Sequence, residues 1–126
     1  MIISGKPILS NVSVETYGVF EVIQLTRGSA LESIVAADWV TIGPEKTSEI
    51  HRHNHSETVL WIVEGSGIVV VNGTDHEVAK GSRIAIGKGV LHGVRTREQA
   101  LTFLSVQSPP ILNKEDGHLD LERFDN

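Results

Sequence analysis

The sequence predicts an all-β fold, a sandwich or barrel built from many short strands. Runs rich in β-branched and aromatic residues recur along the chain, and glycines and other turn residues separate them. No segment of ten or more residues shows a convincing apolar repeat at helical spacing. Asn72-Gly73 is the strongest hairpin signal, because both central positions of a type I′ turn need positive φ. Short strands at such spacing are typical of two-layered or closed antiparallel structures.

The strands follow one another in a regular order. The run 59–63 is almost wholly apolar, as in a buried strand, and we expect Trp61 within it to pack in the core. The following Glu-Gly-Ser-Gly at 64–67 predicts a turn. All the expected strands cover residues 19–25, 34–42, 59–63, 68–71, 76–79, 83–86, 90–95 and 101–107.

Composition limits the class of protein. The 126 residues suit one domain of ordinary size, and 40% hydrophobic residues suffice for a core. Without cysteine, a metal site must use His, Asp, Glu and water. The net charge is −5 with acids and bases interspersed, so we expect no nucleic-acid partner. The chain shows no apolar run long enough for a membrane span and no signal-peptide pattern, so we expect no membrane association and a cytoplasmic setting.

Histidines are the most informative residues. His51, His53 and His55 alternate with Arg52 and Asn54, and alternate side chains of an extended strand point to one face. Neutral imidazole is a common ligand of zinc, iron, copper and nickel. A lone His-x-His is more often part of a polar surface strand, so the surrounding spacing decides.

A fourth histidine belongs to a second spaced motif. Gly81, Gly89 and His92 match the pattern Gly-x5-Pro-x-Gly-x2-His-x3-Asn at every spacing, with Gly87 in place of the proline and Thr96 in place of the asparagine. By this pattern the chain resembles the cupin superfamily.

The first cupin motif, Gly-x5-His-x-His-x3or4-Glu-x6-Gly, fits less closely. His51-x-His53 is present, but Gly43 lies two residues too far upstream, and counting back from Gly65 puts Thr58 at the acidic position. The resemblance covers about residues 40–107, and the spacing between the motifs is that of small single-domain bacterial cupins. It implies a double-stranded β-helix, the jelly-roll barrel of cupins, with residues 1–126 forming a single domain.

The resemblance also implies a metal site. His51, His53 and His92 would be three ligands at the barrel mouth, and would leave an open coordination position. Three candidates remain for the fourth ligand: Glu57, Thr58 and His55. Glu57 is one residue out of register, which turns a strand side chain to the opposite face unless a bulge restores it. The metal could be zinc, iron, nickel or copper, and manganese is less suited to nitrogen ligands.

The tail is similar over a short stretch to the end of the cupin domain in type II mannose-6-phosphate isomerases. A Val-Gln-Ser strand at 106–108 precedes an acidic stretch, 120–125, that holds Arg123-Phe124. If the similarity extends to function, the ligand would be a phosphorylated or nucleotide-linked sugar.

Three classes of function are therefore considered. The first, which we expect, is a metal-dependent enzyme acting on a small polar molecule, either like a sugar-phosphate isomerase or like a cupin dioxygenase. The second is a non-catalytic module or sensor that binds a small ligand. The third is a metal-free barrel whose histidines no longer bind a metal. No catalytic residue can be assigned, although Glu57, His55, Arg83 and Arg95 are acid–base candidates.

A homodimer is expected as the assembly. Sheet edges are usually covered or paired, and the apolar segments 7–9 and 109–112 lie outside the motif-bearing region. Either a second copy covers these segments across a two-fold axis or they fold back over their own subunit.

Overall fold

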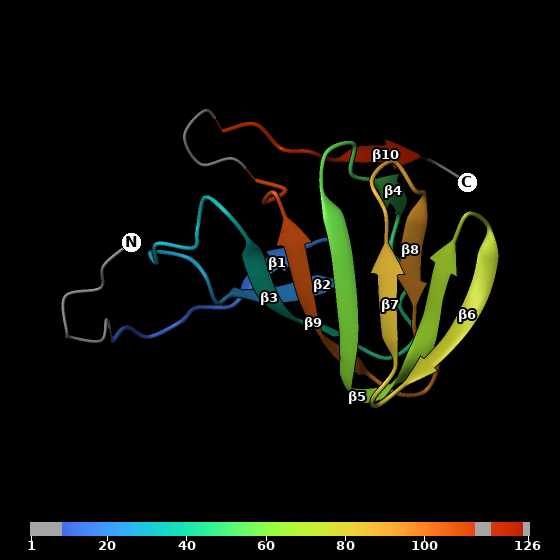
Figure 1. The fold of residues 1–126 in the computed structure, drawn as a ribbon. Helices are drawn as coiled ribbons and strands as arrows, with labels where there is room; N and C mark the ends of the chain where they lie inside the picture. Colours follow the sequence, from blue (N-terminus) through green and yellow to red (C-terminus); the bar gives the residue numbers. More distant parts are fainter. Residues whose placement is uncertain (1–8, 113–116, 125–126) are drawn as a thin grey trace.

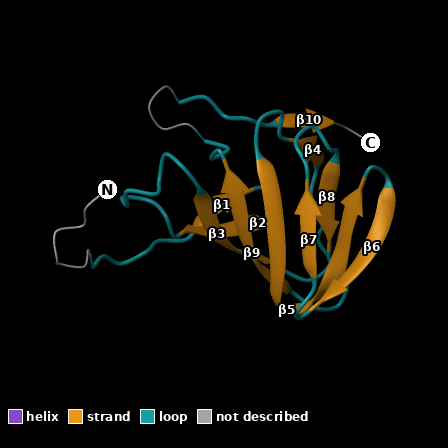
Figure 2. Cartoon of the chain, in the orientation of Figure 1, coloured by secondary structure: helices purple, strands orange, loops and turns teal. Residues whose placement is uncertain are grey.

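The structure is a computed structural model that describes residues 9–112 and 117–124. These residues form strands, turns and loops without a helix, which confirms the predicted all-β class (Figure 2). Consequently, the described residues include no helix that could cross a membrane. In chain order the strands are β1 (Glu15–Tyr17), β2 (Phe20–Gln24), β3 (Ala36–Ile42), β4 (Ile50–Arg52), β5 (Glu57–Val71), β6 (Thr74–Ala79), β7 (Arg83–Ile86), β8 (His92–Arg95), β9 (Leu101–Ser108) and β10 (Glu122–Phe124).

The strands curl into a jelly roll in which two sheets share one long strand. The hydrogen-bonded order is β1-β2-β3-β9-β5-β8-β4-β10, with β6 and β7 also paired to β5. The first half of β5 pairs with β9 and β7, and its second half pairs with β8 and β6. In Figure 1, β5 accordingly stands between the β3/β9 side and the β6/β8 side of the barrel.

The predicted turn at 64–67 is wrong, because β5 continues through it. The pairing of β5 with β9 shifts register between Ile62 and Glu64, so the strand bends rather than reverses. Gly65 permits this bend with a φ of +83°, and a Cβ on it would lie 1.9 Å from the carbonyl oxygen of Ala100. The glycine therefore allows a close approach of two backbones where the sequence indicated a chain reversal.

The predicted hairpin at Asn72-Gly73 is confirmed. Both residues have positive φ, 49° and 79°, and they join β5 to β6. The Asn-Gly pair thus has the two left-handed positions that a tight β-hairpin requires.

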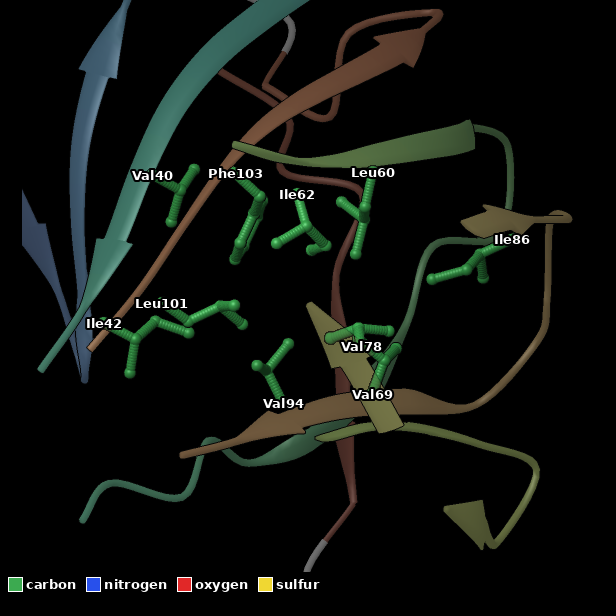
Figure 3. Packing of buried hydrophobic residues seen from close by; sticks show 10 residues of the cluster. All are labelled: Val40, Ile42, Leu60, Ile62, Val69, Val78, Ile86, Val94, Leu101 and Phe103. Atoms are coloured by element: carbon green, nitrogen blue, oxygen red, sulfur yellow. The ribbon is translucent and has the colours of Figure 1, made fainter. Parts of the chain in front are cut away.

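The core lies between the two sheets. Figure 3 shows Val40, Phe103 and Ile62 from one sheet directed toward Val94 and Val69 of the other. Full burial of each such side chain contributes about 1.5–3 kcal/mol. The complete cluster consists of Val40, Ile42, Leu60, Ile62, Val69, Val78, Ile86, Val94, Leu101 and Phe103.

The expectation that Trp61 packs in this core is wrong. Leu60 and Ile62 point inward, so Trp61 between them points outward and is 52% exposed. It pairs in register with Leu104, which pairs on its other side with Trp39. Both tryptophans therefore lie on the outer face of the same sheet.

In the sheet that contains β3, β9 and the first half of β5, the inward-facing positions become polar toward one end. Along β9, Leu101 and Phe103 are followed by Ser105 and Gln107, and all four are buried. The aligned positions of β3 and β5 follow the same order, since Val40 pairs with Phe103 and Thr58 pairs with Gln107. The apolar end forms the floor of the barrel, and the polar end faces a cavity.

Replacement of Gly65 by alanine should destabilise the fold strongly. A left-handed alanine costs about 1–3 kcal/mol, and here the Ala100 carbonyl must move as well. Gly81→Ala is the matched control, because Gly81 has a φ of +91° but open space around it. Urea denaturation should show a clearly larger loss of unfolding free energy for Gly65→Ala. Equal losses would mean that the clash is relieved without cost.

Candidate metal centre

His51, His53 and His92 come together on two neighbouring strands. His51 pairs in register with His92 across β4 and β8, and His53 follows immediately after β4. One ring nitrogen from each lies within 4.8 Å of the others. Their ring centroids are 4.4 Å (His51–His92), 5.1 Å (His53–His92) and 5.2 Å (His51–His53) apart.

Each imidazole is oriented by a hydrogen bond to a backbone carbonyl. The Nδ1 atom of His51 donates to Glu49, that of His53 to Asp120 and that of His92 to Val90, at 3.0, 2.8 and 2.9 Å. A carbonyl can only accept, so Nδ1 carries the proton in each ring. Nε2 is therefore the unprotonated nitrogen, free to bind a metal.

The surroundings keep all three rings neutral. Burial lowers the pKa of His51 and of His53, although their carbonyl partners oppose the shift. Burial and then the neighbouring His51 lower the pKa of His92 to about 4. A neutral imidazole is the form that ligates a metal, so the cluster is prepared for a cation near neutral pH.

The C-terminal segment supplies an unexpected part of the site. The Asp120 carboxylate accepts three backbone N–H groups from the loop after His53, namely those of Asn54, His55 and Ser56. Burial raises the pKa of Asp120, but these bonds outweigh it and hold the pKa below its usual value. The sequence placed Asp120 in an acidic tail but gave no signal of this contact.

The three candidates for a fourth ligand differ in burial. Glu57 and His55 are exposed and lie outside the imidazole cluster, whereas Thr58 is 4% exposed. Thr58 Oγ1 is buried and makes no hydrogen bond within the described residues. His51, His53, His92 and Thr58 all line one cavity, so the donor set fits a cation bound through three nitrogens with room for an oxygen ligand.

That cavity has a volume of about 910 Å³. On the sheet opposite the imidazoles, Gln107 Nε2 donates to Ser105 Oγ at 2.6 Å and to Asp38 Oδ2 at 3.2 Å. Apolar side chains complete the wall, among them Val40, Leu60, Val94 and Phe103. The space suits a small molecule held between an imidazole cluster and a polar patch.

The family model for the cupin domain matches residues 38–107, more than half of the chain. The chain belongs to the cupin family. The motif resemblance seen in the sequence is thereby confirmed, and the imidazole cluster lies where the two motifs meet.

Curated relatives of this cupin differ in function. It is 37% identical over 81 residues to an L-ectoine synthase of Mycobacterium sp. (strain KMS), covering 60% of this chain and 58% of that protein. It is 25% identical over 88 residues to the tetracenomycin polyketide synthase protein TcmJ of Streptomyces glaucescens, covering 69% and 59%. The chain thus spans less than two thirds of the length of these relatives.

Solved structures share the fold at low identity. A sugar phosphate isomerase from Silicibacter pomeroyi superposes with a TM-score of 0.69 at 20% identity, covering 83% of this chain and 77% of the other. A predicted oxalate decarboxylase from Thermotoga maritima superposes with a TM-score of 0.71 at 18% identity, covering 79% of this chain and 94% of the other. The nucleoside dehydratase Pac13 superposes with a TM-score of 0.71 at 9% identity, covering 90% of this chain and 84% of the other. These likenesses establish the fold.

The acid–base candidates from the sequence lie elsewhere. Glu57, His55, Arg83 and Arg95 are absent from the cavity lining. Arg95 instead forms an ion pair with Asp75 at 2.6 Å. The polarity of these residues did not indicate whether their side chains point into the barrel or out of it, since a shift of one residue along a strand moves a side chain to the opposite face.

Glu57→Gln should leave metal affinity nearly unchanged, within about twofold, because the Glu57 side chain is exposed. Isothermal titration with zinc measures this directly. A loss of tenfold or more, equivalent to about 1.4 kcal/mol, would instead place Glu57 among the ligands.

Proposed function

We propose that this cupin binds one divalent transition metal through His51, His53 and His92 and acts as a metal-dependent enzyme on a small polar molecule. The observation that carries the proposal is the convergence of three neutral imidazoles, each with Nδ1 bonded to a carbonyl, on the wall of a cavity. Three nitrogen ligands leave coordination positions open, as catalytic sites require. Zinc, iron, nickel or copper suits this donor set better than manganese.

The residues divide the task between the two sheets. The imidazoles would hold the metal, which when bound supplies Lewis acidity toward an oxygen of the substrate. Asp38, Ser105 and Gln107 offer hydrogen bonds on the opposite wall. Val40 and Phe103 exclude water from the floor below. This arrangement suits a ligand with polar groups at both ends, and both isomerase-like and dioxygenase-like chemistry remain within the proposal.

A non-catalytic small-ligand module is the second candidate function. The observation favouring it is that the cavity lining excludes all four acid–base residues expected from the sequence, although the acids Glu32 and Glu49 line it. Turnover separates the two functions. Metal-loaded protein should be assayed with phosphorylated aldoses and ketoses for isomerisation, and with thiols and diketones for oxygen uptake. Saturable binding without turnover of any substrate would favour the binding module.

His92→Ala should weaken zinc binding by at least about tenfold while the barrel stays folded, since the described core is apolar and His92 faces the cavity. Metal analysis of protein purified without an affinity tag gives occupancy, and circular dichroism checks the fold. His76→Ala is the control, because His76 is exposed on β6 outside the imidazole cluster. Stoichiometric metal in His92→Ala would overturn the ligand assignment.

We propose further that the cupin is a homodimer. Of the two segments expected at the interface, residues 110–112 line the cavity of their own chain, and residues 7 and 8 lie outside the described residues. The outer face of the sheet that contains β3, β9 and the first half of β5 offers a better surface. There Trp39, Leu104 and Trp61 are adjacent across three strands, with the tryptophans 37% and 52% exposed. A two-fold axis would place this row against its own copy.

Light scattering should therefore give twice the chain mass of 13.7 kDa at tens of micromolar protein. Trp61→Glu should shift the mass toward the monomer, because it places a charge in the apolar row. Thr74→Glu, at the exposed start of β6, should leave the mass unchanged. A wild-type monomer would rule the dimer out.

A further inference from the structure

We infer that Asp120 is a positioning residue that places His53 in the metal site. The inference rests on the proposed function, since His53 matters as a ligand only if a metal binds. It goes further by assigning a role to a residue that lies far from both cupin motifs in the sequence.

The contrast among the three histidines carries the inference. His51 and His92 are each oriented by a carbonyl two positions earlier in the chain, those of Glu49 and Val90. Their orientation is therefore a local property of β4 and β8. His53 donates instead to the carbonyl of Asp120, 67 positions away, at 2.8 Å. Only a docked C-terminal segment can orient this ring.

The side chain of Asp120 fixes the same segment from the other direction. One carboxylate oxygen accepts the N–H of Asn54 at 2.7 Å, and the other accepts those of His55 and Ser56 at 2.8 and 3.1 Å. Bonds between a carboxylate and backbone N–H groups are charge-assisted and stronger than neutral ones. One residue thus holds both the imidazole of His53 and the loop that follows it.

Asp120 is itself anchored by neighbouring backbone. Its N–H donates to the carbonyl of Ile111 at 2.8 Å, and β10 begins two residues later and pairs with β4. Arg123 of β10 lies opposite His51 and forms an ion pair with Glu49 at 2.8 Å. β4 is therefore held between β8 on one edge and the tail on the other.

A purely packing role would not need this side chain. Asp120 is 5% exposed, and burial of a carboxylate is costly unless hydrogen bonds compensate it. An apolar residue would fill the same space without that cost. The three N–H groups that donate to the carboxylate explain why a charged side chain is buried here, and they belong to the loop that follows His53.

Asp120→Asn tests the role, because the amide retains the shape but turns one acceptor oxygen into a donor facing N–H groups. Zinc affinity, measured by titration of the full chain, should fall by roughly 10- to 100-fold, as for other residues that orient a ligating histidine. Glu122→Gln is the matched control. Glu122 is a tail acid two residues away that pairs with Arg52 at the surface, and its loss should change affinity less than twofold.

A second readout uses metal-free protein and does not depend on the proposed function. Nitrogen-15 NMR of the imidazoles should show the proton of His53 on Nδ1 in the wild type. In Asp120→Asn this signal should broaden or shift to a mixture of tautomers, while the His92 signal stays unchanged. If the wild type binds no zinc, the proposed function fails, but the NMR comparison still decides whether Asp120 positions His53.

The outcomes that overturn the inference are specific. Unchanged zinc affinity together with an unchanged His53 signal in Asp120→Asn would do so. Asp120→Ala provides a second variant, and near-UV circular dichroism checks that each is folded. Loss of the fold in both variants would also overturn it, because Asp120 would then be a residue of the folding core.

Discussion

The arrangement of the site depends on desolvation of three imidazoles at one end of a barrel. Nitrogen donors placed this close together would repel one another if they were protonated, and burial removes the water that would stabilise the charged form. The backbone carbonyls that accept from Nδ1 then fix which nitrogen carries the proton. Without burial the rings would titrate near pH 6.5, and without the carbonyls their open nitrogens would not be defined.

The barrel separates the parts that provide stability from the parts that provide chemistry. Along β3, β5 and β9, inward positions change from apolar to polar within a few residues, for example from Phe103 to Gln107. The apolar end supplies most of the hydrophobic stabilisation, because buried apolar area contributes roughly 25 cal/mol per Å². The polar end contributes little to this term, and its side chains line the cavity instead.

Sequence reasoning succeeded where the signal was local. Alternation placed His51 and His53 on one side, the spacing from Gly81 located His92, and Asn72-Gly73 identified the hairpin. The same alternation was wrong for His55, which is exposed because β4 ends at Arg52 and the chain beyond it is no longer an extended strand. It failed where one residue type serves two purposes. Glycines near 65 suit a bend as well as a turn, and an apolar run such as 59–63 does not tell which face is buried.

The role of the tail was also hidden from the sequence. Asp120 meets the loop after His53 across more than sixty residues, and no periodicity or spacing encodes such a contact. Asp120 lies between Leu119 and Leu121 in a stretch noted only for its acidic composition and its Arg-Phe pair, and neither feature identifies a partner for its carboxylate. Long-range contacts of single residues emerge only once the strands are arranged in space.

The position of the tryptophans has a practical consequence for spectroscopy. The chain contains two, Trp39 and Trp61, and both lie on the outer face of one sheet, away from the residues that line the cavity. Their emission therefore reports the polarity of that outer surface. Occupancy of the cavity by a small ligand should change the tryptophan emission little, whereas covering of the outer face of the sheet should shift its wavelength. A probe of ligand binding needs a fluorophore placed on the inner wall.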